Sequence, residues 1–206
     1  MSSSDWWCAL RAGVFLIPDY SGESVHLVKE AIEKVNRKNR DVVVASVHWG
    51  GNWGWDPERG QRDFAHRLID HAGVHVVHGH SSHHVKGIEV YKGKLILYGC
   101  GDLVNDYEGI DTHHGQEAEY RGEVGALYFA DIDVNTGELK ALEIVPTRIR
   151  HLSAHVAGRA DASWLAKTLT VLGLDFQTKV EKTPGNALSL VWSDTAGLYD
   201  SMDLLP

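Results

Sequence analysis

The sequence has 206 residues, 43% hydrophobic and 23% charged, a balance that allows a buried core in one domain or in a piece of a larger protein. The formal net charge of -8 argues against the basic surface by which a protein binds DNA or RNA non-specifically. Cys8 and Cys100 define no disulfide framework, so the redox compartment stays open. The first residues do not have the pattern of a signal peptide, and no apolar run approaches the roughly 18 residues of a membrane span, so we expect a cytoplasmic protein.

The first 40 residues predict an irregular lead-in, a strand and a helix. Residues 1–12 form the lead-in, and residues 13–17, GVFLI, predict a buried strand whose partner would be a missing upstream segment. Ser21 is placed to cap a helix over residues 22–38, which ends in lysine and arginine, as the helix dipole favours. Apolar residues recur along it at helical spacing, at Val25, Val28, Ile32 and Val35.

The next segment predicts a parallel βαβ unit. Residues 41–47, DVVVASV, are too apolar for a surface strand and predict a buried central strand that ends at His48. Pro57 and Glu58 open a second helix that ends at Gly73, and a second buried strand over residues 74–77 follows. Because parallel strands carry their carboxyl ends to one edge of a sheet, we expect His48 to lie beside the loop HGHSSHH, residues 78–84.

The rest of the chain predicts antiparallel hairpins. Their turns fall at residues 92–93, 135–137 and 184–185, where the residue types tolerate a positive φ, and a short helix begins near Asp161. The predicted fold class is therefore α/β, as a single domain over residues 1–206 that is finished by antiparallel hairpins.

Histidines are the main functional signal, because seven of the thirteen lie between His66 and His84. Neutral imidazole is the commonest protein ligand of transition metals. The best candidates follow apolar strands into Gly- or Ser-rich loops: they are His48, His80 and His83. For His78 and His84 the ligand and structural interpretations are balanced. His66, His71 and His75 are more typical of a helix face or end, and His26 and His155 are left out of the site.

Two loops could contribute other groups to the site. Trp49, Trp53 and Trp55 could form a packed hydrophobic lid or stack on a substrate, with Asn52 beside them, and both interpretations stay open. Asp102 lies in a Gly-rich loop, whereas Asn105 and Asp106 are better explained as turn formers.

At these residues the chain resembles a known family. The strings VHWGGNWGW, GHSSHH, GIEVYKGKLILYGCGD and NDYEGI, with a Gln61-containing helix between the first two, resemble the CapA-type poly-γ-glutamate capsule-synthesis proteins. That family has a calcineurin-like metallophosphoesterase fold. The resemblance covers most of residues 13–192, and it is specific because several unusual strings occur in the same order.

The resemblance implies roles for individual residues. His48 matches a metal-binding histidine of an H-W-G motif, and Asp102 falls where the family often has asparagine near the site. In the histidine loop two assignments stay open. If Ser81 occupies the first ligand position, only His83 is left of the motif's pair, and His80 could replace the missing ligand. If His78 and His80 form the pair, His83 contacts the ligands and does not bind the metal itself.

The front of the family pattern is not found. Asp-x-His, Gly-Asp and Gly-Asn-His motifs, which supply further ligands and a candidate general acid, do not occur in residues 1–47, and Gly51-Asn52 is followed by Trp53. The implied fold is a metallophosphoesterase-like α/β sandwich that lacks its N-terminal βα layer. Three histidines could hold one zinc with an open position, but two ions need bridging carboxylates.

The implied function is capsule or poly-γ-glutamate biosynthesis, through hydrolysis of a small-molecule or polymer substrate. It would use one or two divalent transition metal ions, Mn, Zn or Fe, with His48 and His80 as catalytic ligands and Trp49, Asn52 and Trp53 as substrate contacts. Nucleic acid is not expected as a partner, and a homo-oligomer is. The alternatives are a non-catalytic metal-binding or interaction module, and an incomplete gene model of a full-length enzyme.

Overall fold

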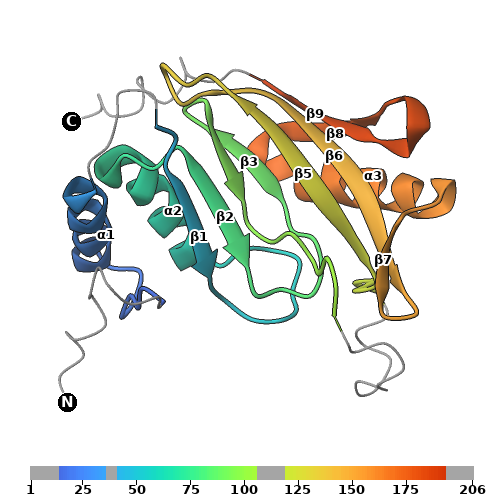
Figure 1. The fold of residues 1–206 in the computed structure, drawn as a ribbon, viewed down its shortest axis with the longest axis horizontal. Helices are drawn as coiled ribbons and strands as arrows, with labels where there is room; N and C mark the ends of the chain where they lie inside the picture. Colours follow the sequence, from blue (N-terminus) through green and yellow to red (C-terminus); the bar gives the residue numbers. More distant parts are fainter. Residues whose placement is uncertain (1–13, 36–40, 106–118, 194–206) are drawn as a thin grey trace.

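The computed structural model describes residues 14–35, 41–105 and 119–193, which form two β-sheets and three α-helices (Figure 1). The predicted lead-in over residues 1–12 lies outside the described residues. Within the described ranges, none of the helices combines the length and the hydropathy that crossing a lipid bilayer requires.

The N-terminal helix α1, Gly22–Lys34, confirms the predicted cap. Ser21 accepts a hydrogen bond from the backbone N–H of Ser24, and Val25 faces the core. The helix ends earlier than predicted, because Val35 is already extended, with φ -82° and ψ 132°. The predicted strand over residues 13–17 is wrong: residues 14–17 have no regular structure, since no neighbouring described strand offers them a ladder of hydrogen bonds.

The first sheet contains the predicted βαβ unit. β1 pairs in parallel with β2, β2 pairs in parallel with β4, and β3 is antiparallel to β4. The helix α2 connects β1 to β2. A reciprocal capping box between Glu58 and Gln61 begins this helix, and Gly73 ends it at a φ of 73°. The bounds are β1 Val44–His48, α2 Arg59–Ala72, β2 Val76–His80, β3 Ile88–Tyr91 and β4 Lys94–Leu97.

The prediction of a buried central strand at residues 41–47 is wrong in position. The strand is β1, and it lies at the edge of the order β1-β2-β4-β3. Its residues alternate between exposed and half-buried, and Val44 is 56% exposed. The β-branched run does form a strand, but only β2 pairs with it among the described strands.

The second sheet contains the predicted later hairpins and is antiparallel, in the order β5-β6-β9-β8, with β7 pairing β6. All three hairpin turns lie where the sequence predicts them. Lys92 and Gly93, which join β3 to β4 in the first sheet, have positive φ, and so do Gly137 and Gly185 in the turns of the second sheet. The bounds are β5 Val124–Ile132, β6 Leu139–Arg150, β7 Ser153–Val156, α3 Arg159–Leu172, η2 Leu174–Phe176, β8 Thr178–Lys182, η3 Pro184–Asn186 and β9 Leu188–Trp192.

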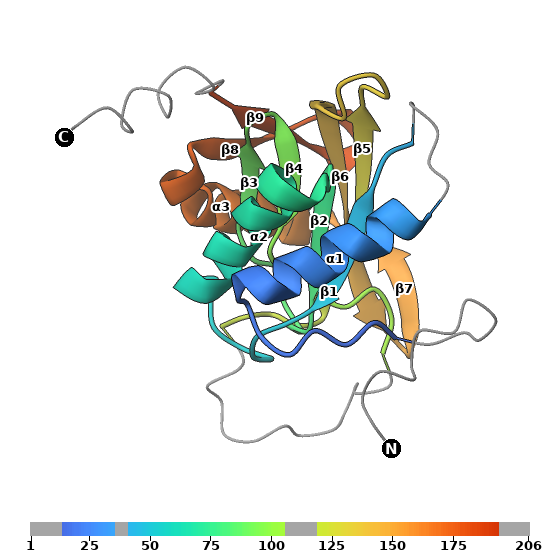
Figure 2. The ribbon, with the colours of Figure 1, turned by 90° about the vertical axis from the view of Figure 1, so that its left-hand side faces the viewer.

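Two apolar clusters hold the layers together. One joins Leu95 of the first sheet, Ile144 of the second and Leu165 of α3. The other packs Phe64 and Leu68 of α2 onto the opposite face of the first sheet, and Figure 2 shows α1 and α2 together on that side. The mixed α/β class is confirmed, and the metallophosphoesterase-like arrangement stays a prediction.

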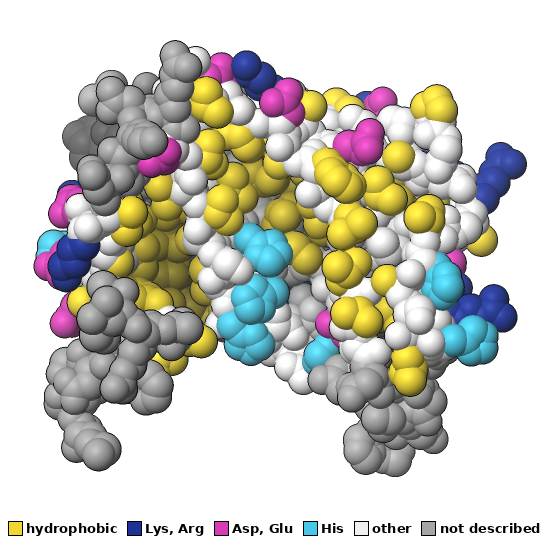
Figure 3. Space-filling view, viewed as in Figure 1, with side chains coloured by type: hydrophobic (Ala, Val, Ile, Leu, Met, Phe, Trp, Pro, Cys, Tyr) yellow, Lys and Arg dark blue, Asp and Glu magenta, His cyan; other side chains and the backbone are white. Residues whose placement is uncertain are grey.

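Both sheets leave apolar residues exposed at one edge. Leu127 and Phe129 of β5 are 38% and 56% exposed, and Val44 of β1 is exposed too. Figure 3 shows hydrophobic side chains around a hollow beside a column of histidine side chains. Edge strands and apolar patches of this kind are usually covered or paired.

We therefore expect the chain to self-associate through this surface, so that its sedimentation mass rises with protein concentration. Phe129→Lys places a charge on the edge strand and should shift the protein towards monomer. Val171→Lys is the matched control, because Val171 is 64% exposed but lies on α3. A mass that is independent of concentration in all three proteins would contradict the expectation.

Candidate functional site

The β1–β2 register builds a column of polar side chains on one face of the first sheet. Ser46 lies opposite His78, and His48 lies opposite His80. Since alternate strand residues share a face, all four side chains project to the side on which Val76 packs in the shared core. The Ser46 hydroxyl is 2.9 Å from His78 Nδ1, and His48 Nδ1 is 3.3 Å from His80 Nδ1. Two of the predicted candidates, His48 and His80, are therefore in direct contact.

The surroundings of this column favour uncharged imidazole. Burial lowers the pKa of His78. Burial also lowers the pKa of His80, and repulsion from His78 and His48 adds to the effect. Because metal ligation needs the neutral ring, both shifts extend the pH range in which these nitrogens can bind a cation.

The His48–His80 spacing fits part of a metal site. Two bonds of about 2.0–2.1 Å to one tetrahedral ion hold their nitrogens about 3.3–3.4 Å apart, close to the separation of the two Nδ1 atoms. The described residues, however, contain no group of three or more His, Cys, Asp or Glu side chains that could hold an ion. The expected trio with His83 is thus not assembled there, and metal binding stays a prediction.

His83 has a different partner. The chain turns between His80 and His83 through Ser81, whose φ of 125° is strained for a residue with a side chain. His83 Nδ1 lies 2.9 Å from Asp102 Oδ2, and the Asn105 side chain donates to the same oxygen at 2.6 Å. Asn105, predicted only as a turn former, therefore also holds the carboxylate.

His84 is packed rather than exposed to substrate. Its ring stacks on Trp53 at 5.9 Å between centroids, and Tyr120 and the edge of Trp55 complete the surroundings. Nδ1 lies 2.9 Å from the Val85 carbonyl oxygen and donates to it, whereas the buried Nε2 has no hydrogen-bond partner among the described residues. Burial lowers the pKa of His84 to about 4.

The two tryptophans predicted to contact substrate differ. Trp49 is 5% exposed, stacks on Tyr98 and donates its indole N–H to the Tyr98 carbonyl, so the packing alternative describes it. A Cβ on Gly79 would lie 2.5 Å from the Trp49 ring nitrogen, which explains why glycine separates His78 from His80. Trp53 is half-buried and contacts His83, and the exposed Asn52 accepts a hydrogen bond from the His83 backbone through its carbonyl.

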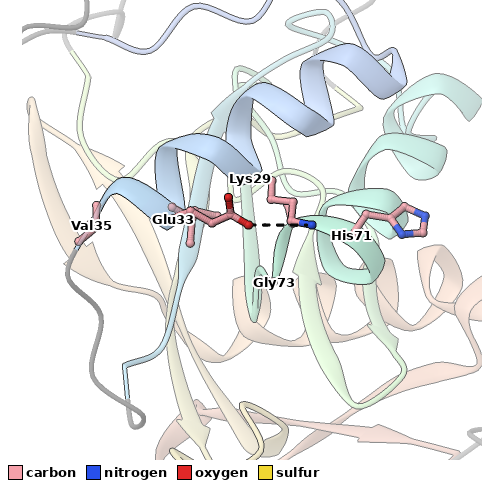
Figure 4. Close-up of a pocket in the computed structure, with 7 residues that line it drawn as sticks. Lys29, Glu33, Val35, His71 and Gly73 are labelled. Carbon is pink, nitrogen blue, oxygen red and sulfur yellow. Dashed lines mark ion pairs between the residues drawn. The ribbon is translucent and has the colours of Figure 1, made fainter.

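The other histidines of this region, His66, His71 and His75, have different surroundings. His66 binds Glu89, which also accepts a hydrogen bond from Tyr98, and His75 Nδ1 accepts the backbone N–H of Val43. His71 lines a pocket between α1 and α2, in which Lys29 and Glu33 form an ion pair (Figure 4). That pocket shares no residue with the histidine column; its lining is Lys29, Ile32, Glu33, Val35, His71, Ala72 and Gly73.

Comparison with known proteins agrees with these motifs. Residues 6–107 match the family model described as bacterial capsule synthesis protein PGA_cap. A probable polyglutamine synthesis accessory protein of Mycobacterium tuberculosis is 41% identical over 187 residues, which are 90% of this chain and 48% of the relative. The chain belongs to the CapA-type capsule-synthesis family.

Two proteins named CapA are similar to shorter parts of this CapA-type chain. PGA biosynthesis protein CapA of Bacillus subtilis is 32% identical over 102 residues, 48% of this chain and 27% of the relative. Capsule biosynthesis protein CapA of Bacillus anthracis is 35% identical over 82 residues, 40% of this chain and 20% of the relative. The chain spans about half the length of the mycobacterial relative and less of these two.

Sequence reasoning missed two contributors to this CapA-type site. Ser46 was part of an apolar run, and only its alternation with His48 could have placed it on the histidine face. Tyr120 contacts Trp53, Trp55 and His84, and no signal in the sequence points to it, because its position depends on contacts far along the chain.

The buried His84 predicts a loss of stability in acid. Its pKa of about 4 lies below the unfolded value of 6.5, so the unfolded chain binds more protons between these values. The free energy of unfolding should therefore fall as the pH drops from about 6.5 towards 4, by at most roughly 3 kcal/mol from this residue.

His84→Asn keeps a side-chain donor for the Val85 carbonyl and removes the titrating ring, so chemical denaturation across this pH range should give a shallower slope. The exposed His26→Asn is the control and should match wild type. An unchanged slope in His84→Asn would show that His84 is not the source.

Proposed function

We propose that this CapA-type chain acts in capsule or poly-γ-glutamate synthesis as a metal-dependent, phosphoesterase-like hydrolase. The observation that carries the proposal is the His48–His80 pair, whose Nδ1 atoms are 3.3 Å apart at the carboxyl ends of two parallel strands. This is the edge at which α/β folds place ligands, and it lies inside the region that matches the family model.

The residues of the proposed site would have different roles. His48 and His80 would hold a divalent transition metal, Mn, Zn or Fe, which supplies a Lewis acid when bound. His78 lines the same face and keeps its orientation through Ser46. Trp53, which is half-buried beside His83, would contact a small-molecule or polymer substrate together with Asn52 of the same loop.

A non-catalytic metal-binding or interaction module is the second candidate. The small number of ligands favours this candidate. Two neutral histidines bind one ion weakly, and they supply no negative charge to balance the charge of the ion. The described residues add no third ligand to the pair, and residues 1–47 lack the family's carboxylate motifs.

Metal binding separates these ideas from a purely structural role of the histidines. Wild-type protein should bind a divalent transition metal, and His48→Ala and His80→Ala should each weaken binding by more than about tenfold. Removing a residue that only hydrogen-bonds to a metal ligand already lowers metal affinity by about that factor. Elemental analysis and calorimetric titration with Zn and Mn measure this. His26→Ala is the exposed control; equal metal content in all four proteins would refute the site.

Hydrolysis separates the two candidate functions. We expect the chain by itself to hydrolyse bis(4-nitrophenyl) phosphate poorly, well below the roughly 1 s⁻¹ at the lower end of typical enzymes, because the family's carboxylate motifs do not occur in residues 1–47. Added Mn or Zn should raise this low rate if the chain is a hydrolase, and should leave it unchanged if the chain is the non-catalytic module. Robust metal-dependent turnover that His48→Ala abolishes would show instead that the histidine pair suffices.

A further inference from the structure

The strand β1 has one side on which none of the described strands pairs with it. On its other side, the Val43 carbonyl accepts the backbone N–H of Val76 at 3.1 Å, and the Trp49 N–H donates to the His80 carbonyl at 3.0 Å. Successive residues of a strand turn their backbone N–H and C=O groups to alternate sides, so these two bonds fix which residues face β2. The residues whose backbone groups point to the open side are Val44, Ser46 and His48.

The open side of β1 borders an apolar groove. Figures 1 and 2 together place α1 beyond the open edge of β1, and Figure 3 shows hydrophobic side chains in the hollow between α1 and the histidine column. Val28 and Ile32 of α1 and Ala45 and Val47 of β1 are all half-buried, and they pack against the cluster that holds Phe64 of α2. The groove therefore has backbone hydrogen-bonding groups on one wall and apolar side chains on the other wall and the floor.

Two of the other sheet edges are protected from pairing with another chain, whereas β1 is not. β8, at the edge of the second sheet, has Lys179, Glu181 and Lys182, and the first two form an ion pair. At the far edge of the first sheet, the Thr178 hydroxyl donates to the Ile88 carbonyl of β3. The β1 residues, VASVH, include no lysine, arginine, aspartate, glutamate or proline. Since charges, proline or a cover usually blunt an edge strand, β1 is suited to accept a partner strand.

We propose that this groove binds an extended polypeptide strand, which adds to the first sheet beside β1. The amide groups of the partner would pair with the outward backbone groups of Val44, Ser46 and His48, and every second side chain would point to the apolar floor. Because the groove side chains of α1 and β1 are uncharged, the partner would have apolar, preferably β-branched, residues at those alternate positions. The inference does not rest on the proposed hydrolysis, since the backbone of β1 carries it.

A single extended segment fits this groove better than a folded domain or a helix. Neighbouring strands lie about 4.8 Å apart, so one strand needs only one such spacing beside β1. A second copy of the chain that paired through its own β1 would bring its β2 to the next spacing, on the side where α1 lies (Figure 2). A helix bonds its own backbone groups and would leave those of β1 without partners.

The first test uses wild-type protein and a fluorescein-labelled peptide, KTVTVTVTK, in which valine and threonine alternate. Fluorescence anisotropy should show saturable binding. Only alternate amides of a strand face its neighbour, so N-methylation of all the threonines or of all the valines should differ in effect: one methylated peptide should bind at least about tenfold more weakly, and the other should keep most of its affinity. Loss of binding in both or in neither, or a parent peptide that does not bind, would overturn strand addition.

The second test changes the groove. Val44→Pro removes one outward N–H, and Val28→Lys places a charge in the apolar wall. Each should weaken binding of the parent peptide by about tenfold or more, because an edge proline cannot donate to a new strand and a buried charge is costly. Val171→Lys, at an exposed position of α3, is the matched control for the lysine and should bind like wild type. Unchanged binding in both groove variants would mean that the peptide binds elsewhere.

Two further measurements keep this result separate from folding defects and from the proposed metal site. Circular dichroism checks that the variants are folded, and if either is not, the methylated peptides with wild-type protein still decide. His48→Ala keeps the backbone groups of β1, so it should bind the peptide as wild type does even where it loses metal. Loss of peptide binding in His48→Ala would show that the imidazole and not the β1 backbone holds the peptide, and would overturn the proposal.

Discussion

The parallel pairing of β1 with β2 is the constraint on which the candidate site depends. Its register sets His48 beside His80 and Ser46 beside His78. Because side chains two positions apart share a face, one residue of slip would turn every histidine of the column to the helix side. The helix side is filled by Phe64, Leu68 and Val77, so the core and the site specify the same register.

The same face carries both apolar packing and polar chemistry. Val76 begins β2 inside the core shared by the two sheets, whereas His78 and His80 lie further along the strand and are only partly buried. Partial burial lowers the pKa of both rings and so favours their neutral form without enclosing them. Because His78 and His80 lie at the margin of the core, their rings favour the neutral form and still remain accessible, a combination that neither full burial nor full exposure would give.

Two adjacent histidines show how surroundings assign roles within one loop. The His83 ring contacts the Asp102 carboxylate and remains partly accessible. His84, the next residue, is enclosed by Trp53, Trp55 and Tyr120, and its depressed pKa makes it a neutral packing group. The sequence HSSHH alone does not distinguish the two residues, because their imidazole rings have the same chemistry when their surroundings are left out.

The sequence by itself determined what local chemistry controls: the Ser21 cap, the stop at Gly73, the hairpin turns with positive φ, and the meeting of His48 with His80, which the parallel rule requires. The tertiary structure alone decided that β1 is an edge strand, that Trp49 is buried under Tyr98, and that His83 faces Asp102. The last two contacts join residues 49 and 19 positions apart. Such contacts depend on how the sheets and loops pack, and a pattern confined to one element carries no information about its neighbours in space.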